Sequence, residues 1–239
     1  MRIDQSGRSR AASISTSEVT LPLFLTRETK YFYAIVVGFL TLILYMSANH
    51  FPLIPPRELP LSWVDRMTPF MPNTVWIYAS EYIFFFAAYI VGRDFENLNK
   101  YLYSFLALQI VSVMIFFVWP TTYPRGDFPL PQDLNALTYY LFSSLRHADA
   151  PTNCCPSLHV SSVFLTTFLF LDEQKGKFPF FFLWGSEIAI STLTTKQHYL
   201  IDVATSLMMA VLFYWVFHRL ISYRWIAGKA PADGAQPNR

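Results

Sequence analysis

The stretch YLYSFLALQIVSVMIFFVW, residues 101–119, decides the fold. It contains no Asp, Glu, Lys or Arg. A helix needs roughly 17 to 25 predominantly apolar residues to cross the hydrocarbon core of a bilayer. The stretch therefore predicts a membrane-spanning helix.

Five further apolar blocks of similar character are separated by short polar stretches. Only 14% of the residues are Asp, Glu, Lys or Arg, whereas 53% are apolar. A soluble domain carries about 25% charged residues, so this chain has too few charges to cover a water-facing surface. One block alone could be a buried helix of a soluble protein, but six would need a polar shell. We therefore predict an all-α fold, a polytopic membrane helical bundle with six transmembrane helices. The other blocks are 31–48, 74–91, 157–171, 178–194 and 200–220.

The basic residues orient this bundle. Six spans place both termini on one side, and all but five of the eighteen Lys and Arg residues fall on that side. Positive residues near span ends are retained in the cytoplasm. Both termini are therefore predicted to be cytoplasmic. The five basic residues on the other side are Arg57, Arg66, Arg125, Arg146 and Lys196.

A histidine and an aspartate four residues apart introduce reactive groups. His198 and Asp202 stand at the start of the sixth predicted span, and residues with this spacing share one helix face. A carboxylate held against one imidazole nitrogen makes the other nitrogen a better nucleophile. A carboxylate near the end of a span also needs a partner. We therefore predict a catalytic pair; a structural pair that caps the span is the alternative.

A second histidine lies in the sequence PSLH, residues 156–159, which opens the fourth predicted span. Pro156 suits the first turn of a helix. The backbone N–H groups of Ser157, Leu158 and His159 would then be unpaired at the positive end of the helix dipole, where an anion is favoured. The Ser157 hydroxyl can add a donor, and His159 can give a proton to a leaving oxygen.

Basic side chains on the same face complete a predicted phosphate site. Two such histidines can transfer a phosphoryl group through a phosphohistidine, without a metal if Arg or Lys neutralises the phosphate oxygens. Arg125 is the first choice for this clamp because guanidinium binds phosphate in a bidentate manner. Lys196 and Arg146 are the second choices. We expect no metal ion and no other cofactor, and we assign Glu81 and Glu187, inside predicted spans, to packing.

These residues resemble the motifs of the type-2 phosphatidic acid phosphatase superfamily. Its membrane members have six spans and the motifs K-x6-R-P, P-S-G-H and S-R-x5-H-x3-D. Residues 156–159 match the second motif with Leu in place of Gly, and Ser191, His198 and Asp202 match the third in spacing. The resemblance covers most of residues 101–220.

The resemblance implies a role for each matched side chain, and the chain departs from the pattern at the cations. The Arg of the third motif is Thr192, and the Lys expected seven residues before Arg125 is Val118. Arg125 is followed by Gly126 where the motif has Pro. The implied roles are His198 as nucleophile, Asp202 as its orienting partner, His159 as acid for the leaving group and Ser157 as a phosphate contact.

With these departures the chain also resembles a branch of the same superfamily, the inositol phosphorylceramide synthase-like and sphingomyelin synthase-like transferases. Those proteins have P-S-L-H or related forms and H-Y-x-x-D, as in residues 198–202. We therefore expect a lipid phosphatase that hydrolyses a phosphate or diphosphate ester through a phosphohistidine. The first alternative is a lipid head-group phosphotransferase, and the second is a catalytically silent membrane relative.

The expected partners are a phosphorylated membrane lipid and the bilayer itself, and the oligomeric state stays open. No nucleic acid is expected, because the net charge of +2 is spread over span ends. We expect an integral multi-pass protein of a bacterial inner membrane whose active site is on the periplasmic or outer face. We assign residues 1–30 to a cytoplasmic N-terminal segment, 31–220 to a six-span catalytic membrane domain and 221–239 to a disordered cytoplasmic tail.

Overall fold

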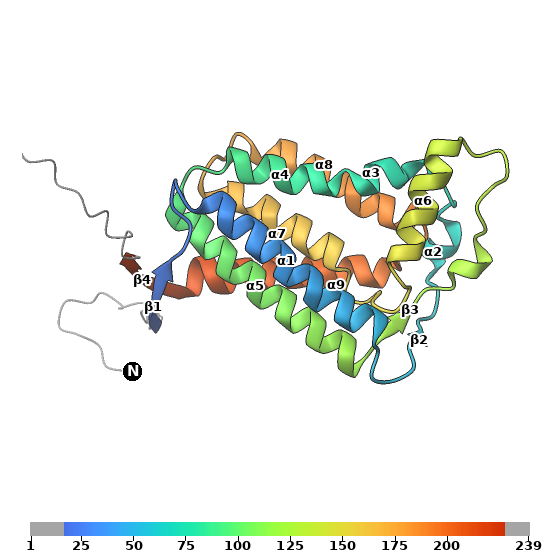
Figure 1. The fold of residues 1–239 in the computed structure, drawn as a ribbon, viewed down its shortest axis with the longest axis horizontal. Helices are drawn as coiled ribbons and strands as arrows, with labels where there is room; N and C mark the ends of the chain where they lie inside the picture. Colours follow the sequence, from blue (N-terminus) through green and yellow to red (C-terminus); the bar gives the residue numbers. More distant parts are fainter. Residues whose placement is uncertain (1–16, 228–239) are drawn as a thin grey trace, which may run out of the picture.

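The computed structural model describes residues 17–227, and it is a bundle of long helices (Figure 1). Each of the six predicted apolar blocks forms helix, so the helical prediction is confirmed. The second block is divided at Ser80 into α3 and α4. The bundle helices are α1 (Lys30–His50), α3 (Val75–Ala79), α4 (Glu81–Val91), α5 (Phe95–Val118), α7 (Leu158–Asp172), α8 (Phe178–Thr194) and α9 (Leu200–Trp215), the last continued by the π-helix η3 (Val216–Leu220).

Four segments are long and apolar enough to cross a membrane by themselves, which supports a membrane protein. The other two bundle helices are shorter, with 15 residues in α7 and 17 in α8. The number of six spans therefore stays a prediction. The four segments are Lys30–His50, Pro72–Val91, Phe95–Val118 and Leu200–Leu220.

Helix α7 is the centre of the bundle, and this explains its apolar composition. It packs against α4, α5, α8 and α9, and almost all its side chains are buried. Gly185 of α8 permits a close approach, because a Cβ there would lie 2.9 Å from a methyl carbon of Val163. Burial of α7 on all sides brings its first turn, which carries His159, into the interior.

The two ends of the described chain pair with each other. Strand β1 (Ser17–Leu23) runs parallel to β4 (Ile221–Ala227), in the register Ser17 to Ile221 through Leu23 to Ala227. The disorder expected for 221–239 is therefore wrong for 221–227, because a partner strand satisfies the backbone of this segment. The expected tail residues 228–239 lie outside the described residues, as do residues 1–16 of the expected N-terminal segment.

Short elements gather at the opposite end of the bundle from β1 and β4 (Figure 1). The largest is α6 (Ala136–Ala148), which the apolar blocks do not predict because its hydrophobic side is narrow. The side chain of Asn135 starts this helix by accepting a hydrogen bond from the Leu137 amide at 2.9 Å. The others are α2 (Trp63–Met67), β2 (Arg57–Glu58), β3 (Thr121–Thr122), η1 (Pro72–Thr74) and η2 (Arg125–Asp127).

Candidate active site

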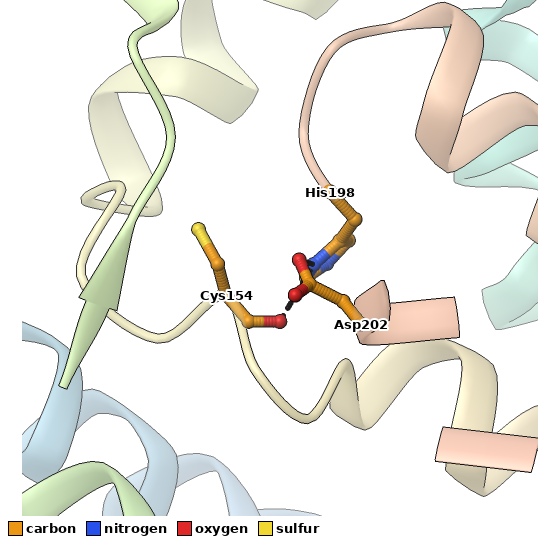
Figure 2. A group of neighbouring side chains, drawn as sticks. All are labelled: Cys154, His198 and Asp202. Carbon is orange, nitrogen blue, oxygen red and sulfur yellow. Dashed lines mark hydrogen bonds and ion pairs between the residues drawn. The ribbon is translucent and has the colours of Figure 1, made fainter. Parts of the chain in front are cut away.

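His198 is held by two acceptors at one of its ring nitrogens. Nδ1 lies 2.9 Å from the backbone oxygen of Cys154 and 3.2 Å from Oδ2 of Asp202. Figure 2 shows the carboxylate and this carbonyl beside the imidazole. Two acceptors at Nδ1 require that this nitrogen carries the proton, which leaves Nε2 with its lone pair. In residues 17–227, Nε2 has no hydrogen-bond partner.

The connection between α8 and α9 sets the position of this pair. The backbone oxygen of Thr192 accepts hydrogen bonds from the amides of Gln197 and His198. Lys196 has a φ of 55°, the left-handed conformation that lets the chain reverse here. Asp202 then accepts a hydrogen bond from the Tyr199 amide at 2.8 Å, which closes the first turn of α9. The aspartate therefore caps the helix and orients His198 with the same oxygen.

His159, at the start of α7, contacts two groups that sequence reasoning did not place in the site. Its Nε2 lies 2.7 Å from the hydroxyl of Tyr78 and 3.2 Å from Oε1 of Glu81. Both partners are buried. In the sequence analysis, Glu81, a carboxylate inside a predicted span, is assigned to packing. No sequence pattern indicated a role for Tyr78. In the described chain, Nδ1 of His159 has no hydrogen-bond partner.

The two histidines face each other across the start of α7 and the start of α9. Their ring centroids are 5.9 Å apart. One nitrogen of each ring has a partner that fixes the ring, and within residues 17–227 the other nitrogen has no hydrogen-bond partner. This separation allows one phosphate group to contact both rings, so the arrangement fits one group as nucleophile and the other as acid.

The first turn of α7 differs slightly from the predicted helix start. Ser157 is the N-cap residue, and its hydroxyl accepts a hydrogen bond from the Val160 amide at 3.3 Å. Helix α7 therefore begins at Leu158, two residues after Pro156. Within the described residues, the amides of Leu158 and His159 have no acceptor, as is usual in a first helical turn. These two amides, more than the Ser157 hydroxyl, are placed to bind an anion.

Arg125, predicted to clamp phosphate, is paired with a carboxylate. Its Nη2 lies 3.0 Å from Oδ2 of Asp149, and its Nη1 donates to the Asp149 backbone oxygen. Tyr45 and Asn49 of α1 also donate to the Asp149 side chain. Asp149 was not among the predicted site residues, because its distance from α1 in sequence hides this contact.

The two second-choice cations are also engaged in the loops. The Lys196 ammonium donates to the backbone oxygens of Asp65 and Thr68, at 2.9 and 2.6 Å. Burial lowers the pKa of this ammonium, and Asp65 opposes the shift. The Arg146 guanidinium lies over the Phe142 ring, and burial lowers its pKa to about 10. Both side chains therefore contact loop segments in this structure, and their predicted contact with phosphate stays a prediction.

A family model described as the PAP2 superfamily matches residues 57–216. The chain belongs to the PAP2 superfamily. This confirms the superfamily to which the motifs pointed, and it supports a phosphatase or phosphotransferase type of enzyme. A search of curated proteins and a search of solved structures each give no significant match.

The PAP2 match spans all the residues that form the histidine pair, and two cysteines lie beside them. Atoms offered by Cys154, His198 and Asp202 lie within 4.8 Å of one another, the proximity expected of metal ligands. Figure 2 shows, however, that the sulfur of Cys154 points away from the imidazole. The backbone of Cys154 therefore contributes to this PAP2 site, and a reaction without a metal stays an expectation.

We predict that both thiols of this PAP2 protein react slowly in the folded state. Burial raises the pKa of Cys154 well above its usual value and that of Cys155 to about 11, so thiolate is scarce at pH 7. Iodoacetamide labelling in detergent, followed by mass spectrometry, should run at least about tenfold slower than labelling of the same protein unfolded in dodecyl sulfate. Equal rates in the two states would contradict the burial of these side chains.

Proposed function

We propose that this chain is a membrane lipid phosphatase that works through a phosphohistidine on His198. The observation that carries the proposal is the facing pair of imidazoles, whose ring centroids are 5.9 Å apart. Each ring is held at one nitrogen, and among the described residues the other nitrogen has no partner. The proposal needs no metal ion, because His198 supplies the nucleophile and the histidine pair supplies the proton transfer.

In the first proposed step, the lone pair of His198 Nε2 attacks phosphorus and the bond to the leaving lipid oxygen breaks. Nδ1 of His159 gives its proton to that oxygen, so the lipid leaves as an alcohol. In the second step, water gives a proton to Nδ1 of His159 while its oxygen attacks phosphorus. The nitrogen to phosphorus bond breaks, its electrons return to His198, and inorganic phosphate is released.

A cavity beside His159 supports a lipid as the substrate. It has a volume of about 660 Å³ and lies between α1, α4, α5 and α7. The carboxylates of Asp149 and Glu81 and the His159 ring line it at one end, and most of its remaining lining is apolar. The apolar lining suits the hydrocarbon chain of a lipid, and His159 borders both this cavity and the histidine pair, so the cavity supports a chain lying between α1 and α4.

We predict that Gly38→Phe selectively impairs turnover of long-chain substrates. Gly38 lines this cavity on α1, and a Cβ added there meets no atom within 4 Å, so a phenyl group would project into open space. For a long-chain lipid phosphate, kcat/KM should fall at least about tenfold, because hydrocarbon contacts are displaced. A water-soluble aryl phosphate should be hydrolysed at an unchanged rate.

The variant Gly38→Ala is the matched control, since a methyl group leaves most of the cavity open. Equal losses on long-chain and soluble substrates would argue for misfolding of α1. An unchanged kcat/KM for the long-chain lipid would reject the cavity as its binding site.

A lipid head-group phosphotransferase is the second candidate, favoured by the sequence HYLID at residues 198–202 and by Leu158 in the second motif. The phosphohistidine step is shared, and an alcohol would replace water in the second step. The bacterial inner membrane, cytoplasmic termini and an active site on the outer face belong to the same proposal. The starts of α7 and α9, which hold the histidine pair, lie toward the bundle end opposite to β1 and β4 (Figure 1), which supports a site and termini on opposite faces.

One experiment separates the candidates. The purified protein in detergent is given labelled phosphatidate, an isoprenyl diphosphate and a phosphodiester lipid, each with and without a lipid alcohol and with chelator. Phosphate release supports the phosphatase, and a product that requires the added alcohol supports the transferase. Loss of activity with chelator would reject the reaction without a metal, and inactivity on all substrates would indicate a silent relative.

A further inference from the structure

The site contains a second pair of histidine and carboxylate that no matched motif includes. Glu81 is the first residue of α4, and its side chain is only 5% exposed. A carboxylate in the interior of a membrane protein is costly unless it has a partner or a function. Its Oε1 lies 3.2 Å from His159, while in the described residues Oε2 has no partner at all. This carboxylate is therefore directed at the histidine and is not satisfied by packing.

Tyr78 and Glu81 contact the same ring nitrogen from one side. The Tyr78 hydroxyl lies 2.7 Å from Nε2, and its ring centroid is 4.8 Å from the imidazole centroid. The two residues are three apart in sequence and come from adjoining short helices. Together they hold the ring so that Nδ1 points away from them, and no group in residues 17–227 forms a hydrogen bond with Nδ1.

The charges around His159 indicate what its contact with Glu81 does. Glu81 is the nearest carboxylate, at 3.2 Å, and the Tyr78 hydroxyl contacts the same nitrogen. Asp149 and Arg125 act on the ring through charge from farther away, and the facing His198 is 5.9 Å distant between ring centroids. Arg125 is already neutralised by Asp149. A carboxylate in contact with Nε2 favours the doubly protonated ring. An imidazolium at His159 would then offer the proton on Nδ1 as a charged hydrogen-bond donor next to the phosphate.

We propose that Glu81 is a positioning residue that keeps His159 protonated on both nitrogens, so that Nδ1 presents its proton to the leaving oxygen. This inference rests on the proposed phosphatase function. Tyr78 fixes the plane of the same ring. The motifs have cations at the positions of Thr192 and Val118 in this chain. The protonated ring of His159 offers a charged hydrogen-bond donor at the reacting phosphate.

The test compares substrates that differ in their need for a proton on the leaving oxygen. An alkyl phosphate requires that proton, whereas a nitrophenyl phosphate does not, because nitrophenolate is a stable anion. In Glu81→Gln, kcat for the alkyl ester should fall by about 30-fold to 100-fold, a part of the usual contribution of a general acid. For the nitrophenyl ester, kcat should stay within about threefold of the wild type.

The pH profile gives a second measurement. The alkaline limb of the alkyl-ester profile should move to lower pH in Glu81→Gln, because the imidazolium has lost its stabilising charge. Glu81→Asp retains a carboxylate and should keep the wild-type profile with an intermediate kcat. If Glu81→Gln does not fold, the kcat and the pH profile of Glu81→Asp test the proposal instead.

The matched control is Glu187→Gln, the same change at an exposed position of α8, which should leave both substrates and the profile unaltered. Equal losses on both esters with an unmoved profile would overturn the proposal and assign Glu81 a structural role. Unchanged kinetics in Glu81→Gln would also overturn it. A wild type that hydrolyses neither ester would instead reject the phosphatase function itself, and the inference with it.

Discussion

Replacing His198 with glutamine is expected to lower phosphatase turnover by at least about a thousandfold, because the variant lacks the nucleophile. Glutamine preserves much of the side-chain volume and can still donate to Asp202 or to the Cys154 carbonyl. The loss should therefore reflect chemistry more than folding. The measurement is phosphate release from a lipid phosphate in detergent.

The same variant gives a direct test of the covalent intermediate. Wild-type protein quenched in alkali during turnover of a radiolabelled substrate should retain label, since phosphohistidine survives alkali and is lost in acid. His198→Gln should retain none. His147→Gln, an exposed position on α6, is the matched control and should behave as the wild type does. Label retained by His198→Gln would assign the nucleophile to another residue.

Replacing His159 with glutamine should have the next largest effect, and a different one. For an alkyl phosphate, turnover should fall by about a hundredfold to ten-thousandfold, because the leaving oxygen receives no proton. A nitrophenyl phosphate should still form the phosphoenzyme. The second step lacks its base, so labelled phosphohistidine should accumulate above the wild-type level. Rapid-quench labelling measures this accumulation.

A rapid release of nitrophenol followed by a slow steady rate would be the kinetic sign of this trapped state. The Tyr78→Phe variant, which keeps His159, should show no such burst. Equal losses on both substrates without accumulated label would contradict separate roles for the two imidazoles.

The helices and the histidine pair were accessible from sequence because each depends on local patterns. Long runs without charge predicted the bundle, and the bounds of α8 agree with the block at residues 178–194. The spacing of His198 and Asp202 predicted their contact, since four residues are about one helical turn. The pairing of His159 with His198 followed from topology, because both stand at helix starts on one side.

The rest of the site depends on contacts that sequence spacing does not encode. Arg125 was predicted to clamp phosphate, and its ion pair with Asp149, 24 residues away in sequence, was not predicted. Glu81 reaches His159 across 78 residues, and only the packing of α4 against α7 brings them together. Strands β1 and β4 were missed for the same reason, because each finds its partner at the other end of the chain.

The enclosed position of α7 also affects how the protein is made. This helix is short and carries several hydroxyl side chains, so it is a weak signal for entry into the lipid phase when considered alone. Its neighbours α8 and α9 are synthesised after it. The phosphate site can therefore be completed only when the last helix has entered the membrane. A chain truncated before residue 200 would lack Asp202, which orients His198, and it would lack α9, which packs against α7.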